Sequence, residues 1–190
     1  MLLHAWLVFA DEGYEQTSLR KIARNAGISS SLITYLFHSK EELWYAAVVA
    51  QMDPTHNEYM HEFDALLQQP QAGFMEIKQL LMLCIDRTLE DPVRFRFLFT
   101  ESEGDGARSA YLRERYLMPY LQKVYVLYTK ACAASQHTPM DSSTLFTVLM
   151  GVVRFILFPN LLGMFLPAGK NDSTQIRELM SRVLNQLLPE

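Results

Sequence analysis

Residues 17–40 read TSLRKIARNAGISSSLITYLFHSK and contain four basic side chains and no acidic one. The chain of 190 residues has a formal net charge of -4, so positive charge is concentrated in this stretch against an acidic background. A basic element on an acidic body indicates a polyanionic partner such as DNA.

The first half of this stretch predicts a short helix. Thr17 is a candidate N-cap, and Leu19, Ile22 and Ala23 share one helical face at i, i+3 and i+4. Gly27 then supplies the permissive backbone that ends the helix.

The second half predicts another short helix after an immediate turn. Ser29 is placed to cap it, and four apolar residues give it a packing face, namely Leu32, Ile33, Leu36 and Phe37. The hydroxyl-bearing residues between them are expected to face outward. Two helices joined by a glycine turn form a helix-turn-helix, whose second helix enters the major groove of DNA. The alternative is a pair of amphipathic helices from an ordinary all-helical domain, and the charge contrast and cap spacing favour the DNA-binding interpretation.

The amino-terminal part of the chain resembles the TetR family of transcriptional regulators. The shared features, in the family's order and spacing, are FADEGY at 9–14, TSLRKIA at 17–23, AGIS at 26–29, LITYLF at 32–37 and SKEEL at 39–43. The resemblance implies an all-α protein with a three-helix DNA-binding head at 1–45. It also implies a helical body at 46–190 that dimerises and holds a small-molecule effector.

Two departures from the family pattern are visible. Many relatives have glycine where this chain has His38, so a backbone role for that glycine is not carried over. The family also usually has a basic arm before its first helix, whereas this sequence starts almost inside that helix. Fewer phosphate contacts and a shallower dependence of affinity on salt are therefore expected.

The candidate DNA contacts are hydroxyl, aromatic and basic side chains of the head: Thr17, Ser18, Ser29, Ser30, Ser31, Thr34, Tyr35, His38 and Lys40. Hydroxyls and amides at the helix starts suit phosphates. Within this set, Thr34 is expected to contact a base, Tyr35 the DNA backbone and Lys40 a phosphate.

The body is punctuated by helix start and stop signals. The first expected helix begins at Lys40, is interrupted or kinked at Asp53-Pro54 and resumes over 57–69. Two further helices are expected over 74–90 and from Pro92 to Gly104. The remaining helices are expected over 108–135 with a kink at Pro119, over 142–165 with a bend at Pro159, and after Asp172. Residues 144–166 contain a single charge, Arg154, and that arginine favours a buried helix over a membrane span.

Cys84 and Cys132 lack metal-type spacing, which favours buried reduced thiols in a cytoplasmic protein without a signal peptide.

The last helix has a clear apolar stripe. From the residues alone, such a stripe is more often ordinary core than interface. The family resemblance reverses this preference, because it implies that the last two long helices pair with their copies in a homodimer. The candidate interface residues are Phe155, Leu162, Ile176, Leu179, Met180, Val183 and Leu187.

An effector site is expected among the middle helices, which are rich in aromatic residues and methionine. Most of these side chains are expected to be core. The candidate effector contacts are Phe99, Tyr120, Met150, Arg154 and Phe158. Arg154 requires an anion, and an internal carboxylate such as Glu101 or Glu103 is favoured over an acidic group on a flat or elongated apolar effector.

Catalytic and metal-binding patterns are not readable in the sequence. The five histidines are scattered, and no nucleophile–base pair or glycine-rich phosphate loop is present. We therefore expect a regulator, not an enzyme, without cofactor or metal.

The protein is expected to be a homodimeric repressor that leaves a palindromic operator when a small molecule binds the body. The alternatives are a transcriptional activator, or a helical binding module or enzyme without a DNA function.

Overall fold

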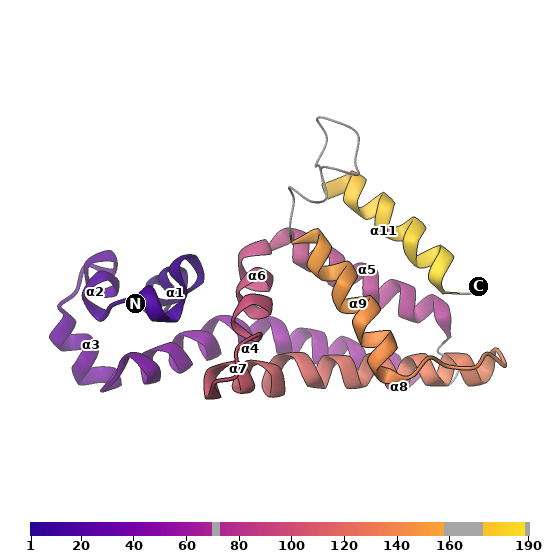
Figure 1. Cartoon of the computed structure of the whole chain (residues 1–190), viewed down its shortest axis with the longest axis horizontal. Coiled ribbons are helices and arrows are strands. Elements are labelled where there is room, and N and C mark those ends of the chain that lie inside the picture. Colours follow the sequence, from indigo (N-terminus) through magenta and orange to yellow (C-terminus); the bar gives the residue numbers. More distant parts are fainter. Residues whose placement is uncertain (70–72, 158–172, 189–190) are drawn as a thin grey trace. The chain divides into compact units, whose positions relative to one another are not determined.

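The computed structural model describes residues 1–69, 73–157 and 173–188, and every regular element in these residues is a helix. The chain divides into two compact units, Met1–Tyr59 and Met60–Glu190, with the division inside one long helix (Figure 1). An all-α protein with a small amino-terminal head and a larger helical body is therefore confirmed.

The first unit holds three short helices and the start of a fourth. These are α1 (Leu2–Gln16), α2 (Leu19–Ala26), α3 (Ser30–Phe37) and α4 (Lys40–Leu67). α2 packs against both α1 and α3, which is the arrangement of a helix-turn-helix on a supporting helix. The interior of this unit is built from large apolar side chains that are almost fully buried: Trp6, Phe9, Ile22, Ile33, Leu43 and Trp44.

The long helix α4 begins where the sequence predicted. The Ser39 hydroxyl accepts a hydrogen bond from the backbone N–H of Glu42 at 3.0 Å, which satisfies one free donor of the first turn. The helix then continues through Pro54 to Leu67, so of the two predicted outcomes, an interruption or a kink, the interruption does not occur. A proline removes one backbone donor, and neighbouring helical residues can outweigh that loss in a helix of 28 residues.

The second unit is organised around α5 (Phe74–Glu90). This helix packs against α6 (Pro92–Glu101), α8 (Met118–Ala134), α9 (Ser142–Ile156) and α11 (Ser173–Leu187). The predicted cap of α6 is confirmed, since Asp91 accepts a hydrogen bond from the backbone N–H of Arg94 at 3.1 Å and Pro92 is the first helical residue.

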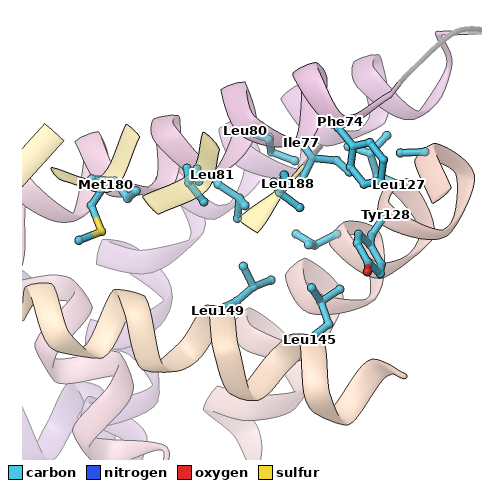
Figure 2. Packing of buried hydrophobic residues seen from close by; sticks show 14 of the residues in the cluster. Phe74, Ile77, Leu80, Leu81, Leu127, Tyr128, Leu145, Leu149, Met180 and Leu188 are labelled. Atoms are coloured by element: carbon cyan, nitrogen blue, oxygen red, sulfur yellow. The ribbon is translucent and has the colours of Figure 1, made fainter. Parts of the chain in front are cut away.

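The apolar side chains of four helices meet in the core of the second unit. Figure 2 shows Ile77 and Leu81 of α5 near Leu188, which follows α11, with Leu145 and Leu149 of α9 facing them. Leu127 of α8 is completely buried in the same cluster. Removing one such leucine side chain costs about 2 to 5 kcal/mol, so this cluster dominates the stability of the unit.

The segment predicted as one helix over 108–135 is divided into three. α7 (Ala107–Leu112) is followed by a π-helical turn, η1 (Arg113–Leu117), and then by α8. Pro119, expected to produce a kink, lies in the first turn of α8. Its ring excludes a normal hydrogen bond to the carbonyl of Arg115, so the distortion falls in the preceding turn.

Both cysteines are free and buried, as predicted, and burial raises the pKa of the Cys84 thiol. Of the helices within residues 1–69, 73–157 and 173–188, none is long and apolar enough to cross a bilayer. The predicted bend at Pro159 and the predicted cap at Asp172 lie outside the described residues.

Candidate nucleic-acid interface and body cavity

The start of α2 is capped by Ser18, and the prediction of Thr17 as its N-cap is wrong. The Ser18 hydroxyl accepts from the backbone N–H of Lys21 at 3.3 Å. Thr17 is instead only 3% exposed and donates its hydroxyl to the carbonyl of Gly13 at 2.7 Å. The buried Thr17 hydroxyl is therefore not presented to a phosphate, whereas Ser18 is exposed at the helix start.

The turn between α2 and α3 has the predicted construction. Gly27 adopts a left-handed backbone conformation with φ of 66°, which ends α2. Ser29 then accepts from the backbone N–H of Leu32 at 3.2 Å and lies 3.0 Å from the Ser31 hydroxyl. Both helix ends are thus fixed by local hydrogen bonds that the sequence predicts.

The exposed side of α3 is wider and more apolar than predicted. Ser31, Thr34 and Tyr35 are exposed, as expected, and Ser30 is half-buried. Leu32 and Leu36 were expected to pack inward, but they are 42% and 51% exposed.

The physical reason is that α3 has only eight residues and anchors to its unit through a narrow stripe. Ile33 is the buried residue of this helix, and Phe37, one turn later, is half-buried. The remaining apolar residues therefore stay on the surface.

The basic residues of the head divide into two pairs. Lys21 forms an ion pair with Glu12, and Lys40 is held by backbone carbonyls, as described below. Arg20 and Arg24 are both exposed on α2 and form no ion pair within the described part of the chain. These two arginines are the cations of this stretch that remain available to phosphate.

Lys40 was predicted to reach a phosphate, and the structure places its ammonium group elsewhere. The Nζ atom donates to the carbonyls of Tyr14 at 2.9 Å and Thr17 at 3.0 Å. It also lies 4.1 Å from the centroid of the Tyr14 ring. The Tyr14 carbonyl also accepts from the amide of Thr17 at 3.2 Å, so the lysine adds a charged donor at the end of α1 and joins that end to the start of α4.

His38 ends α3 in an unusual backbone conformation, with φ of 58° and ψ of -42°. The amide of Ser39 donates to the carbonyl of Phe37 across this residue, which closes a γ-turn. Glycine adopts a positive φ of this kind without the steric cost of a Cβ atom, which agrees with the glycine that the TetR resemblance implies at this position. The imidazole is exposed and remains a candidate phosphate contact.

The predicted effector residues differ in their exposure and contacts. Phe99, Tyr120 and Met150 are half-buried, and Tyr120 packs edge-on against Phe63 with 4.8 Å between ring centroids. Arg154 is exposed and forms an ion pair with Glu103. The favoured internal partner is thus confirmed, although the expectation of a buried arginine is wrong. Phe158 lies outside the described residues.

A small cavity of about 90 Å³ lies among the apolar side chains of the second unit. Its lining comes from α5, α8, α9, α11 and their flanking residues. It includes Val124 and five leucine or isoleucine residues that are labelled in Figure 2: Ile77, Leu81, Leu145, Leu149 and Leu188. These aliphatic residues were not predicted, because aromatic and charged side chains were taken as the sign of an effector site. The leucine-rich stripes of α9 and α11 were the signal that could have identified them.

The predicted interface residues have different exposures. Ile176 and Met180 are buried in the core of their own unit, where α11 packs against α5, so their assignment to a dimer interface is wrong. The ordinary core interpretation holds for this part of the stripe. Three of the other predicted interface residues are half-buried, namely Phe155, Leu179 and Val183. A fourth, Leu187, is 49% exposed. Leu162 lies outside the described residues.

Comparison with known proteins identifies the amino-terminal unit. Residues 2–47 match the family model for bacterial regulatory proteins of the tetR family. This region contains α1, α2, α3 and the beginning of α4, including the capped helix-turn-helix described above. No curated protein sequence matches the chain.

Solved structures share the fold of the whole chain. A Clostridium perfringens protein, provisionally described as a fatty acid metabolism regulator, superposes with a TM-score of 0.77 at 17% identity over 100% of both chains. A TetR/AcrR family transcriptional regulator from Thermobifida fusca gives 0.64 at 22% identity, over 96% of this chain and 93% of its own. The regulator FadR from Bacillus subtilis, in complex with stearoyl-CoA, gives 0.65 at 14% identity, over 96% and 95%.

These structural likenesses show that the chain shares the fold of the matched proteins in both head and body. The family model shows in addition that the sequence of the head matches the tetR family. The matched proteins are regulators of transcription and not enzymes. The exposed face of α3, the exposed arginines of α2 and the capped turn between these helices all lie within the residues that the family model matches. Residues 2–47 therefore form a DNA-binding head of the tetR family of bacterial regulatory proteins, and the chain as a whole shares the fold of TetR-family transcriptional regulators.

Proposed function

We propose that this protein is a homodimeric repressor that binds a palindromic operator and leaves it when a small apolar molecule enters the body. The observation that carries the proposal is the head, where α3 is exposed beside Arg20 and Arg24. A recognition helix of this kind reads one half-site, so two copies in a symmetric dimer read a palindrome with half-sites about 34 Å or a multiple apart.

The dimer contact is proposed on the exposed edge of the stripe in α11. Leu187 is 49% exposed, and Leu179 and Val183 retain partial exposure after packing against the rest of the unit. Phe155 of α9 is also half-buried and is the described candidate from the preceding long helix. Apolar surface of this kind contributes to association when a second copy removes it from water.

The proposed effector is an elongated molecule with an aliphatic chain. The cavity in the body is lined by aliphatic side chains, which suit a hydrocarbon chain better than a polar ligand. Two structural neighbours are described as a fatty acid metabolism regulator and as a stearoyl-CoA complex, which agrees with this chemistry.

Ligand binding requires the cavity to widen, since ligand pockets usually measure about 300 to 1,000 Å³. The cavity of this structure, about 90 Å³, is much smaller. A ligand that binds only the widened body stabilises that conformation. If this conformation binds the operator more weakly, the ligand lowers the affinity of the protein for DNA. A hundredfold loss of operator affinity needs about 2.7 kcal/mol of coupling, within the range usual for allosteric proteins.

The test begins with selection of duplexes from fragments of the source genome at low salt. We expect a palindromic sequence to be enriched, and transcription in vitro from a promoter overlapping it to fall when the protein is added. Stearate or stearoyl-CoA is then expected to release the DNA in a fluorescence anisotropy titration. Failure to enrich any duplex contradicts operator binding, and increased transcription would indicate an activator.

A cavity-filling variant separates effector binding from DNA binding. Leu149 is 8% exposed and lines the cavity, so Leu149→Phe should occupy the space that the aliphatic chain needs. We expect this variant to bind the operator normally and to resist release by stearate. Equal release from both proteins would place the effector elsewhere.

A further inference from the structure

The exposed side of α3 carries a continuous apolar strip formed by Leu32, Tyr35 and Leu36. These residues are 42%, 77% and 51% exposed. They stand at i, i+3 and i+4, so their side chains are neighbours on one face of the helix. An apolar strip at the centre of a DNA-reading helix needs an apolar partner in the groove.

The polar groups of α3 are poorly suited to read bases by donating hydrogen bonds. Thr34 donates its hydroxyl to the carbonyl of Ser30 at 3.1 Å, and Ser31 is hydrogen-bonded to Ser29 at 3.0 Å. The sequence of α3, SSLITYLF, contains no arginine, lysine, asparagine or glutamine. The side chains that form bidentate contacts with guanine and adenine are therefore absent from this helix.

The surroundings of the strip favour DNA as the molecule that covers it. Residues 17–40 contain no acidic side chain, and Arg20 and Arg24 on the adjacent α2 are exposed. Positive charge beside an apolar strip complements the phosphates and the base edges of a duplex.

We propose that Leu32, Tyr35 and Leu36 read the methyl groups of thymines in the major groove, so that thymines specify the operator half-site. In this proposal Tyr35 contacts a base, and not the DNA backbone as expected from the sequence. The C5-methyl of thymine is the apolar group that a base edge presents in this groove, and contact with it distinguishes thymine from cytosine. This inference rests on the proposed operator binding and names the chemical feature that α3 recognises.

The test replaces each thymine of one operator half-site, in turn, with uracil, which lacks only the methyl group. Loss of one buried methyl should weaken binding about fourfold. Affinity is measured by fluorescence anisotropy for the full chain and for the variants Leu32→Ala, Tyr35→Ala and Leu36→Ala. Leu7→Ala provides a matched control, because Leu7 is 49% exposed on α1 of the same unit.

We expect one or more uracil positions to weaken binding by the unmodified protein and by Leu7→Ala to the same extent. The penalty at a given position should disappear in the variant that has lost the contacting side chain. A cytosine at that position should bind weakly, and 5-methylcytosine should recover part of the affinity. Circular dichroism of each variant verifies that the head is folded.

Two results would overturn the inference while leaving operator binding intact. One is a selected operator without thymine in its half-sites, and the other is a uracil penalty that persists in all three α3 variants. Enrichment of no duplex in the selection would overturn the proposed function itself. Self-association that disappears in Leu36→Ala without a change in the uracil penalty would assign the strip to a protein contact.

Discussion

His38 is a residue whose backbone conformation is costly for its side chain. Its φ of 58° and ψ of -42° lie in a region that non-glycine residues rarely adopt. We expect His38→Gly to raise the free energy of unfolding of the head by about 1 kcal/mol, because glycine removes the steric cost of the γ-turn. Urea denaturation followed by tryptophan fluorescence measures this change.

The control for His38→Gly is His38→Ala, which removes the imidazole but keeps a Cβ atom. It should not stabilise the head. If alanine and glycine stabilise equally, the imidazole and not the backbone carries the cost. An accompanying loss of DNA affinity in both variants would support the predicted phosphate contact of the exposed His38 ring.

Lys40 is expected to act on the stability of the head. Its ammonium donates to Tyr14 and Thr17 carbonyls at 2.9 and 3.0 Å. Lys40→Met keeps most of the stem but leaves these acceptors without their charged donor, which should cost about 1.5 kcal/mol in urea denaturation.

Arg20→Met is the contrasting variant, because Arg20 is exposed and forms no ion pair in the described residues. It should leave stability unchanged and lower affinity for every duplex. It should also reduce the slope of log affinity against log salt concentration by about 1. The reverse pattern, with Lys40→Met affecting only DNA affinity, would restore the original phosphate assignment.

At the level of single residues, sequence predicted the contacts that depend on near neighbours. Ser29 and Asp91 cap helices through amides three residues later, and such spacing is readable in a sequence. Thr17 and Ser18 are adjacent hydroxyls, and their roles are decided by which one the fold buries. The partners of Lys40 are 23 and 26 residues away, so no local pattern reveals them.

Among the elements, the turn between α2 and α3 offers a test of backbone conformation alone. Gly27 has φ of 66°, and a Cβ added there would meet no atom within 4 Å. Gly27→Ala should therefore destabilise the head by about 1 kcal/mol without any clash. Thermal unfolding by circular dichroism measures the change.

Gly106 provides the matched control, since it also has open space around an added Cβ but has φ of -79°. Gly106→Ala should be nearly neutral. A similar loss in both variants would show that loop flexibility, and not the left-handed conformation, determines the effect.

Helix boundaries were predicted well where caps or glycines mark them. α5 spans the predicted Phe74–Glu90, and α6 begins at the predicted Pro92. The prolines inside helices were harder to predict. Pro54 is accommodated in α4, whereas Pro119 follows the π-helical turn η1, and these outcomes depend on the packing around each helix.

For the whole molecule, two leucines of the apolar stripe of α11 should have different effects, one on the stability of the folded chain and the other on dimer formation. Leu184 is 4% exposed in the core, whereas Leu187, less than one turn later, is 49% exposed. Leu184→Ala should lower the free energy of unfolding by about 3 kcal/mol through loss of buried contacts. Denaturation at fixed protein concentration measures this change.

Leu187→Ala should change that unfolding energy little and should weaken the proposed dimer, as measured by sedimentation over a range of concentrations. Dissociation by Leu184→Ala alone would mean that assembly depends on the folded core more than on the exposed edge of α11. An unchanged dimer in Leu187→Ala would place the contact on other helices.

The candidate sites show where sequence reasoning reaches its limit. The helix-turn-helix is a continuous stretch, so its composition and order predicted its position. The cavity is formed by α5, α8, α9 and α11, which are separated along the chain, and its lining depends on how they pack. Arg154 illustrates the same limit, because its partner Glu103 could be shortlisted from the sequence but its exposure could not.

The apolar strip of α3 also affects how operator binding responds to temperature. Removing Leu32, Tyr35 and Leu36 from water on DNA gives a negative heat capacity change, which is the thermodynamic signature of apolar burial. The enthalpy of binding then becomes more favourable as temperature rises, and the plot of log affinity against inverse temperature is curved. Operator occupancy is therefore expected to pass through a maximum at an intermediate temperature, since the entropic gain from released water diminishes with warming.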